Sequence, residues 1–347
     1  MSEAALVGLF VATVQFATLV FLAALGELIA ERAGVLNLGV EGMMAMGAVS
    51  GFMVGLETGS PWAAFFAAAA VGALVGGLHA LVSVILGADQ VVSGLALTIG
   101  GLGLAAYVGR NVVGERPETQ FTDLGIAGLA DIRWFGEIFF NQPPVVYLAV
   151  LLGLAVWFVL ARTRLGLALR AVGESAPTTD AVGHSVMALR AGAVMVGGAF
   201  AGAAGSFLSL YMAPGWTEGM VAGRGWIAVA LVIFGAWRPG RLASGALLFG
   251  FTLALQPRLQ SFDIELLGVE VNSISPALLG ILPFVLTVVV LVIISWRYRH
   301  RPSPAPAALG SGIHGVAPCV RCGVGRSRRT GRLEGGSSSS RAYLCPR

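Results

Sequence analysis

The sequence predicts an all-α protein that crosses a lipid bilayer many times. Three observations carry this prediction: 56% of the residues are apolar, only 12% are charged, and the mean hydropathy is +0.82. A soluble domain usually has about a quarter of its residues charged, so this chain has too little charge to cover a surface that faces water. The 49 glycines agree with this interpretation, because small residues let helices approach closely inside a membrane.

Nine segments are apolar enough to be drawn as membrane-spanning helices, and eight or ten spans remain as alternatives. Two polar stretches, 110–143 and 162–189, separate them. No basic region precedes the first apolar run, so we expect a retained span and not a secretory signal. The predicted spans are Ala5–Ala30, Leu38–Leu56, Trp62–Leu86, Val91–Gly109, Pro144–Ala161, a sixth that ends at Tyr211, Trp216–Ala236, Leu242–Gln256 and Ser275–Trp296.

Arginine accounts for all 22 basic residues, since the chain contains no lysine. If 162–189 is cytoplasmic, most arginines before the tail fall inside, which predicts an external N-terminus and a cytoplasmic C-terminus. The weak point is the short span ending at Ala236, which could re-enter the membrane without crossing it. The arginines placed inside are Arg32, Arg162, Arg164, Arg170, Arg190, Arg238, Arg241, Arg297, Arg299 and Arg301.

The last segment, 302–347, is rich in Pro, Gly, Ser and Arg and poor in aliphatic residues. Such a composition cannot bury a core, so we predict a transmembrane domain over 1–301 and a disordered cytoplasmic tail over 302–347. Cys319 and Cys322 have the spacing of a zinc-ligand pair, with His314 and Cys345 as further candidates. Since a structural zinc site needs four ordered ligands, we expect no metal.

The net charge of +4 and the pI of about 9.3 raise the possibility of nucleic-acid binding. The arginines, however, lie in short loops and in the last fifty residues, which is typical of topology signals in a membrane protein. We therefore expect contact with membrane lipid and no nucleic-acid partner.

Glycines repeat at four-residue spacing in three of the predicted spans. Gly47, Gly51 and Gly55 share one helix face, and the pairs Gly72–Gly76 and Gly198–Gly202 have the same spacing. This spacing is typical of helices in close contact within a membrane. The triple repeat is the stronger evidence, because single pairs occur often by chance in a chain rich in Gly and Ala.

Polar residues at membrane depth gather in the stretch GELIAERAGVLNLGVEGMMAMGA. It contains Glu27, Glu31, Asn37 and Glu41 among several glycines. A charged group at a helix centre costs about 2.5–3.5 kcal/mol to insert, so these side chains should face the bundle interior or a water-filled path. The glycines suggest an interrupted helix. The alternative is that Glu31 and Arg32 pair at the cytoplasmic interface and that the other polar groups only pack helices.

The polar segment 162–189 contains a helix start. Ser175 has the character of an N-cap, Pro177 fits the first turn, and Gly183 is a typical stop. These signals predict one short helix outside the bilayer, at about Ala176–Val182. A capped helix in a long loop favours a docking role over a simple connector.

Several classes of catalytic site are missing from the sequence. A phosphate-binding loop requires a lysine, so any ATP hydrolysis must come from another polypeptide. No Ser/His/Asp set or carboxylate pair indicates an enzyme, and His79 and His184 stand alone. We expect no catalytic residue and no cofactor, and we interpret His79 as a helix residue with ordinary partners.

Three stretches together carry a family resemblance: AERAGVLNLGVEGMMAMGA (Ala30–Ala48), ADQVVSGLALT (Ala88–Thr98) and AGRGWIAVALVIFGAWRP (Ala222–Pro239). They resemble the permease subunits of bacterial ABC importers for branched-chain amino acids, monosaccharides and nucleosides, closest to the nucleoside and simple-sugar branch. The resemblance covers about residues 10–300. Nothing in the family matches 302–347.

The resemblance implies a multi-pass subunit of the bacterial inner membrane that translocates a small polar solute, a nucleoside first and a simple sugar as the alternative. It also implies a second, different permease chain, cytoplasmic ATPase subunits and an extracytoplasmic substrate-binding protein as partners. An ion-coupled secondary transporter and a membrane scaffold are the rival interpretations. The resemblance assigns ATPase coupling to Gly173, Glu174, Ser175, Asp180 and Gly183, where Pro177 and His184 depart from the usual form, and we offer Asn37, Glu41, Gln90 and Ser93 as translocation-pathway residues.

Overall fold

The computed structural model describes residues 3–117, 120–261, 265–266, 269–270, 275–298 and 304–310, and they are predominantly helical. The four strands form two antiparallel pairs, β1 with β2 and β3 with β4. The α-helices are α1 (Glu3–Arg32), α2 (Val40–Thr58), α3 (Pro61–Ala80), α4 (Gln90–Gly109), α5 (Pro144–Arg162), α6 (Arg164–Glu174), α7 (Ala176–Ala181), α8 (Val186–Phe207), α9 (Arg224–Phe234), α10 (Pro239–Ser261), α11 (Pro276–Leu279) and α12 (Leu282–Tyr298). The π-helical segments and strands are η1 (Leu81–Ile85), η2 (Gly136–Phe140), η3 (Leu208–Met212), β1 (Leu124–Gly125), β2 (Asn141–Gln142), β3 (Glu265–Leu266) and β4 (Val269–Glu270).

Six helices in the described part of the chain are long and apolar enough to cross a membrane: Glu3–Arg32, Pro61–Ile85, Gln90–Gly109, Pro144–Arg162, Val186–Met212 and Pro239–Leu259. The prediction of nine spans is therefore confirmed only as a multi-span helical fold. Of the three remaining predicted spans, α2 contains two glutamates and several glycines, and the other two hold only the shorter apolar helices Arg224–Phe234 and Leu282–Ile293.

The predicted span Trp216–Ala236 is wrong as a continuous helix, because its helix begins only at Arg224. The preceding residues form turns, with positive φ at Gly219, Ala222 and Gly223. Left-handed backbone interrupts a right-handed helix, so hydrophobicity alone was a misleading guide to this segment.

Local capping explains where several helices begin. Ser60 accepts from the N–H of Ala63 at α3, with Pro61 in the first turn, and Asp89 accepts from the N–H of Val92 at α4. Ser185 accepts from the N–H of Ala188 at the start of α8. These caps satisfy backbone donors that have no partner within their own helix.

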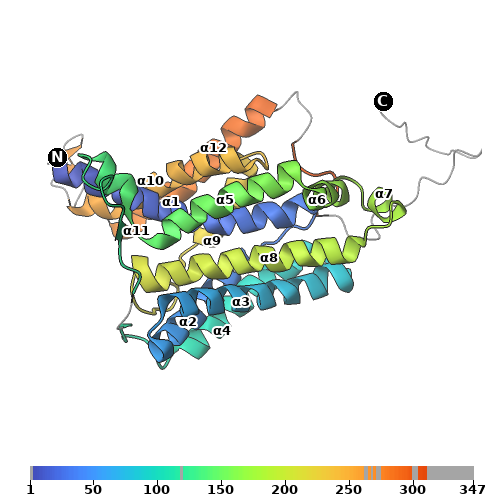
Figure 1. Ribbon diagram of the computed structural model, residues 1–347, viewed down its shortest axis with the longest axis horizontal. Helices are drawn as coiled ribbons and strands as arrows, with labels where there is room; N and C mark the ends of the chain where they lie inside the picture. Colours follow the sequence, from blue (N-terminus) through green and yellow to red (C-terminus); the bar gives the residue numbers. More distant parts are fainter. Residues whose placement is uncertain are drawn as a thin grey trace, which may run out of the picture. The chain divides into compact units, whose positions relative to one another are not determined.

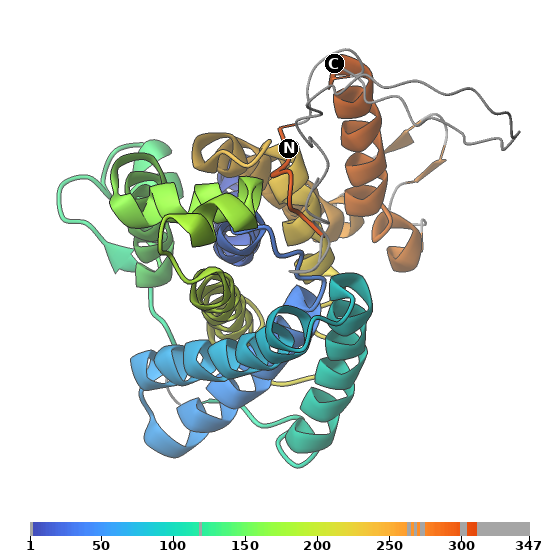
Figure 2. The ribbon, with the colours of Figure 1, turned by 90° about the vertical axis from the view of Figure 1, so that its right-hand side faces the viewer.

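Helix α1 forms the centre of the bundle. It packs against α5, α8, α9 and α10, as Figure 2 shows for the dark-blue helix. Its C-terminal half is buried almost throughout, from Leu19 to Glu31. The polar residues of that half therefore lie inside the protein and away from the lipid-facing surface.

Glycines set the closest helix contacts, as their spacing predicts. A Cβ atom on Gly47 of α2 would collide with the backbone of Gly202 on α8. One on Gly72 of α3 would lie 2.9 Å from Cα of Gly202, and Gly76 faces Val194. The predicted close packing of α2, α3 and α8 is confirmed, because no other residue would let these backbones approach so far.

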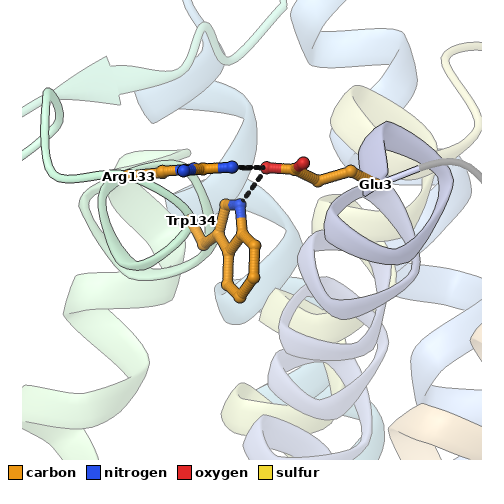
Figure 3. Close-up of polar contacts among 3 residues, drawn as sticks. All are labelled: Glu3, Arg133 and Trp134. Carbon is orange, nitrogen blue, oxygen red and sulfur yellow. Dashed lines mark hydrogen bonds and ion pairs between the residues drawn. The ribbon is translucent and has the colours of Figure 1, made fainter.

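One end of the bundle carries the N-terminus, and α6 and α7 lie at the other end (Figure 1). At the first end, the Glu3 carboxylate accepts from Arg133 at 2.8 Å and from the indole N–H of Trp134 (Figure 3). Both partners belong to the long polar stretch between α4 and α5. The contact therefore ties this connection to the start of α1.

Most of the predicted tail, including its three cysteines and His314, lies outside the described residues. The described piece, 304–310, packs against the bundle: the N–H of Ala308 donates to the carbonyl oxygen of Gly173 at 2.8 Å, and Ala308 is buried. This contact departs from the predicted disorder from residue 302. The physical reason for this contact is that Ala308 is small and apolar and lies beside Gly34 and Gly173, which have no side chains.

Candidate functional site

The chain between α1 and α2 forms a buried loop, residues 33–39. Val35 and Asn37 are both 0% exposed, and Gly34 has a φ of +82°. The predicted interrupted helix is thus present. Inside a membrane, backbone outside a helix must find its hydrogen-bond partners within the protein, so the partners of this loop define the local chemistry.

Side chains from α3 and α4 satisfy the loop at Leu36. The Leu36 N–H donates to Oε1 of Gln90 at 2.8 Å, and the Leu36 carbonyl lies 3.2 Å from Nε2 of His79. The other ring nitrogen of His79 lies 3.0 Å from Oγ of Ser93. Both ring nitrogens therefore have partners, as the interpretation of His79 requires.

Further along the loop, Asn37 is held by α1 and α2. Its N–H donates to Oε1 of Glu27 at 3.0 Å, and its own Oδ1 accepts from the N–H of Gly39 at 3.0 Å. The hydroxyl of Thr98, one turn and a half beyond Ser93 on α4, donates to the Leu38 carbonyl at 2.7 Å. Asn37, Gln90 and Ser93 therefore meet at one buried loop. His79 and Thr98 complete it, and sequence spacing had not singled them out for this role.

The fourth predicted pathway residue, Glu41, contacts a different segment, the start of α9. Its Oε1 accepts from the N–H of Gly223 and its Oε2 from the N–H of Gly225, both at 2.7 Å. Glu41 is 4% exposed. The carboxylate caps the N-terminus of the short helix α9, whose first-turn donors otherwise lack partners.

The end of α1 clasps the turn between α9 and α10. Oε2 of Glu31 accepts from the Trp237 indole N–H at 2.5 Å, and Arg32 donates to the Trp237 carbonyl at 2.6 Å. Ala236 and Trp237 both have positive φ, at 48° and 55°. The alternative that Glu31 and Arg32 pair with each other is wrong, because each binds Trp237 instead.

The predicted short helix in the polar segment is confirmed as α7. Oγ of Ser175 accepts from the N–H of Thr178 at 3.4 Å, Pro177 lies in the first turn, and Gly183 follows with a φ of +85°. Glu174, Asp180 and Gly183 are exposed. Ser175 caps the helix rather than facing a partner, which is a positioning role.

Gly173 differs from the other predicted coupling residues because it is buried. A Cβ atom there would collide with the carbonyl oxygen of Arg32. Gly173 belongs to α6, a helix that the sequence analysis treated as part of a polar connection. The overlooked signal was Thr163, whose hydroxyl accepts from the N–H of Gly166 at 3.1 Å and caps α6.

Residues 9–291 match the family model described as branched-chain amino acid transport system, permease component. TsgC13 of Haloferax volcanii, an ABC transporter permease protein named for glucose, is 45% identical over 82% of this chain and 90% of its own length. The guanosine permease NupQ of Bacillus subtilis is 36% identical over 70% and 80%, and the nucleoside permease NupC of Lactococcus lactis is 32% identical over 69% and 79%. No solved structure matches.

This chain belongs to that permease family. It is accordingly a multi-pass protein of the plasma membrane and the permease subunit of an ABC transporter. Such permeases work with an ATPase and a substrate-binding protein. The resemblance found in the sequence motifs is confirmed over the residues from which it was drawn.

Beside α7, the permease has a hollow of about 400 Å³. It is lined by both apolar and polar residues: Ala176, Pro177, Asp180, Ser185, Val186 and Met187. The hollow lies at the end of the bundle opposite the N-terminus (Figure 1). An exposed helix beside a hollow offers a partner protein both a protrusion and a recess.

Proposed function

We propose that this permease forms the channel half of an ATP-driven importer for a small polar solute, and that solute movement is gated at the buried loop 33–39 and at the start of α9. The observation that carries the proposal is the gathering of Asn37, Gln90 and Ser93 at loop 33–39 and the binding of Glu41 to the first residues of α9. Irregular backbone at membrane depth is typical of transporter binding and gating regions. All four side chains are buried in this chain, so we propose that solute reaches them only after a conformational change.

The proposed topology has nine crossings, with the N-terminus outside and the C-terminus in the cytoplasm. The turns of 213–223 together with α9 would make one crossing, and α12 the last. The contact of Ala308 with Gly173 of α6 supports a location of 304–310 at the same end as α7. We propose 1–301 as the transmembrane domain and 302–347 as the cytoplasmic tail.

ATPase subunits are proposed to dock on α7 and its hollow through Glu174, Asp180 and Gly183, with Gly173 and Ser175 positioning the helix. The chain has no lysine for a phosphate-binding loop, so the nucleotide site would belong to those subunits. Their nucleotide states would favour different conformations of the permease and so bias access to each side.

A second, different permease chain is proposed to complete the channel. Support comes from Bacillus subtilis, in which two permease proteins, NupQ and NupP, are both named for a guanosine ABC transporter. NupP is 25% identical to this chain. The apolar exposed faces of α4 and α5 leave room for such a neighbour, since their outward side chains include Ile99 and Leu151.

The solute is proposed to be a nucleoside, on the similarity to NupQ and NupC. A simple sugar is the second candidate, which the 45% identity to TsgC13 favours. Both carry a hydroxylated ring that amide and hydroxyl side chains can bind.

The test is reconstitution in liposomes with a candidate partner permease, candidate ATPases and a candidate binding protein. Uptake of labelled guanosine and of labelled glucose would be measured with and without ATP. We expect ATP-dependent uptake of guanosine; glucose uptake alone would move the assignment to the sugar. Uptake at full rate after depletion of all nucleotides would refute the proposed mechanism.

Docking is tested by reversing charge at α7. Glu174→Arg and Asp180→Arg should reduce the amount of ATPase that co-purifies with the permease, whereas Glu57→Arg, at the exposed far end of α2, should not. All three variants should insert equally. Unchanged ATPase recovery and transport in both α7 variants would remove the docking assignment.

A further inference from the structure

A basic pocket lies at the junction of α1, α5, α6 and α10. It has a volume of about 520 Å³, and its lining includes four arginines and two tryptophans: Arg32, Arg170, Arg238, Arg241, Trp157 and Trp237. Neither the proposed pathway nor the proposed docking helix uses it. Because α6 contributes to its lining, the pocket belongs to the end of the bundle that carries α6 (Figure 1). The proposed topology, on which this inference rests, places the cytoplasmic membrane surface at that end.

Three of the four pocket arginines have no carboxylate partner among the described residues. Arg32, Arg170 and Arg238 form no ion pair with a described carboxylate. Arg32 donates to the Trp237 carbonyl, and Arg170 only reaches the carbonyl of Gly166 at 3.4 Å. Glu174 lies near Arg32 but makes no ion pair with it. Like charges this close together at a membrane surface attract an anion.

An apolar groove continues from the basic pocket. It measures about 410 Å³ and shares Trp157, Pro239 and Gly240 with the pocket. Its other lining residues are Phe21, Val150, Gly153, Leu154 and Ala243, which belong to α1, α5 and α10. One continuous site therefore joins a cluster of guanidinium groups to a hydrocarbon surface.

The length of the groove suits one leaflet of a bilayer. Phe21 lies eleven residues before Arg32 on the same helix, or roughly 16 Å at 1.5 Å per residue. Half of a typical hydrocarbon core is about 15 Å. A ligand with its anion at the arginines would therefore reach the middle of the membrane along the groove.

We propose that this site binds one anionic phospholipid, with its phosphate at Arg32, Arg170 and Arg238 and one acyl chain along α1, α5 and α10. The N-terminus of the 23-residue helix α10 opens onto the same pocket and adds partial positive charge. The hydrogen bonds of Glu31 and Arg32 with Trp237 fix the turn that contains Arg238. The bound lipid would hold α1, α5 and α10 together.

Native mass spectrometry of the full-length chain in detergent tests the proposal. The probes are dioleoyl phosphatidylglycerol, dioleoyl phosphatidylcholine and inorganic phosphate. We expect one phosphatidylglycerol to bind at least tenfold more tightly than phosphatidylcholine. Arg170→Gln with Arg238→Gln should weaken phosphatidylglycerol about 25-fold, at about fivefold for each arginine near an anionic lipid.

The matched control is Arg162→Gln with Arg164→Gln, which removes the same charge from two exposed arginines outside the pocket. It should leave phosphatidylglycerol binding unchanged. Ala243→Phe, which fills the groove, should weaken phosphatidylglycerol without altering any binding of phosphate. Each variant must retain the helical circular dichroism of the wild type; if the double pocket variant fails this check, Ala243→Phe and the single Arg170→Gln carry the test.

Equal affinity for the two lipids, or an equal loss in the control, would overturn the proposal. Displacement of the lipid by millimolar phosphate, with no effect of Ala243→Phe, would assign the pocket to a free anion instead.

Discussion

The contact between Glu41 and the start of α9 joins two segments that lie 182 residues apart in sequence. Glu41→Ala removes both acceptor oxygens and leaves the buried N–H of Gly225 and the half-buried N–H of Gly223 without partners. Each such donor costs about 1–3 kcal/mol, so the variant should lose about 2–6 kcal/mol of stability. A Cβ at Gly225 would lie 2.6 Å from the Glu41 backbone, so the two segments are in close contact at this point.

Thermal unfolding of the purified chain in detergent, followed by tryptophan fluorescence, measures this loss. An unfolding entropy of about 2.1 cal/mol/K per residue over 347 residues corresponds to about 1.4 °C for each kcal/mol, so the melting temperature should fall by at least about 3 °C. Glu41→Gln keeps one acceptor and should fall between the wild type and Glu41→Ala. The matched control is Glu57→Ala, at the exposed end of the same helix, which should melt with the wild type.

A melting temperature of Glu41→Ala equal to that of the wild type would refute the capping role. If the variant is destabilised but ATP-dependent uptake is unchanged at a temperature where it stays folded, Glu41 supports α9 without gating the solute. The two measurements therefore separate the structural contact from the proposed pathway role.

Three further outcomes follow from the packing and capping. Gly202→Leu should abolish folded, monodisperse protein, because the leucine side chain would collide with the α3 backbone. Gly192→Leu on the same helix meets open space and should be tolerated. Equal yields of the two variants by size-exclusion chromatography would contradict this. Ser175→Ala should cost about 1 kcal/mol of α7 stability and speed hydrogen exchange over 176–182, and unchanged exchange would show that the cap is unimportant. Glu3→Gln should leave the melting temperature unchanged at low and high salt, because its pair with Arg133 is exposed to water, and a clear drop would be unexpected.

Local signals in the sequence were sufficient for much of this protein. The helix α7 followed from Ser175, Pro177 and Gly183, whose effects reach only a few residues along the chain. The glycine spacing predicted the close approach of α2 to its neighbours, since a missing side chain is needed wherever backbones meet. Hydropathy predicted the long helices, because a helix that crosses lipid needs a long run of apolar residues, which is visible in the sequence.

Hydropathy failed where tertiary contacts decide the backbone. The segment 213–223, in which a span was predicted to begin, contains Pro, Thr, Glu and three Gly residues and forms turns, and Glu41 supplies the acceptors for the helix that starts after it. Sequence also indicated that Asn37, Gln90 and Ser93 are polar residues near membrane depth. It could not show that they share one loop, or that Trp237 binds both Glu31 and Arg32.

The sequence by itself therefore determined the membrane environment, the family and the capped helix α7, since each depends on composition or on residues within a few positions of one another. The tertiary structure alone decided which buried polar groups meet and where arginines from three helices surround one pocket. Such contacts join residues as far as 206 positions apart, and they exist only once the whole bundle has packed.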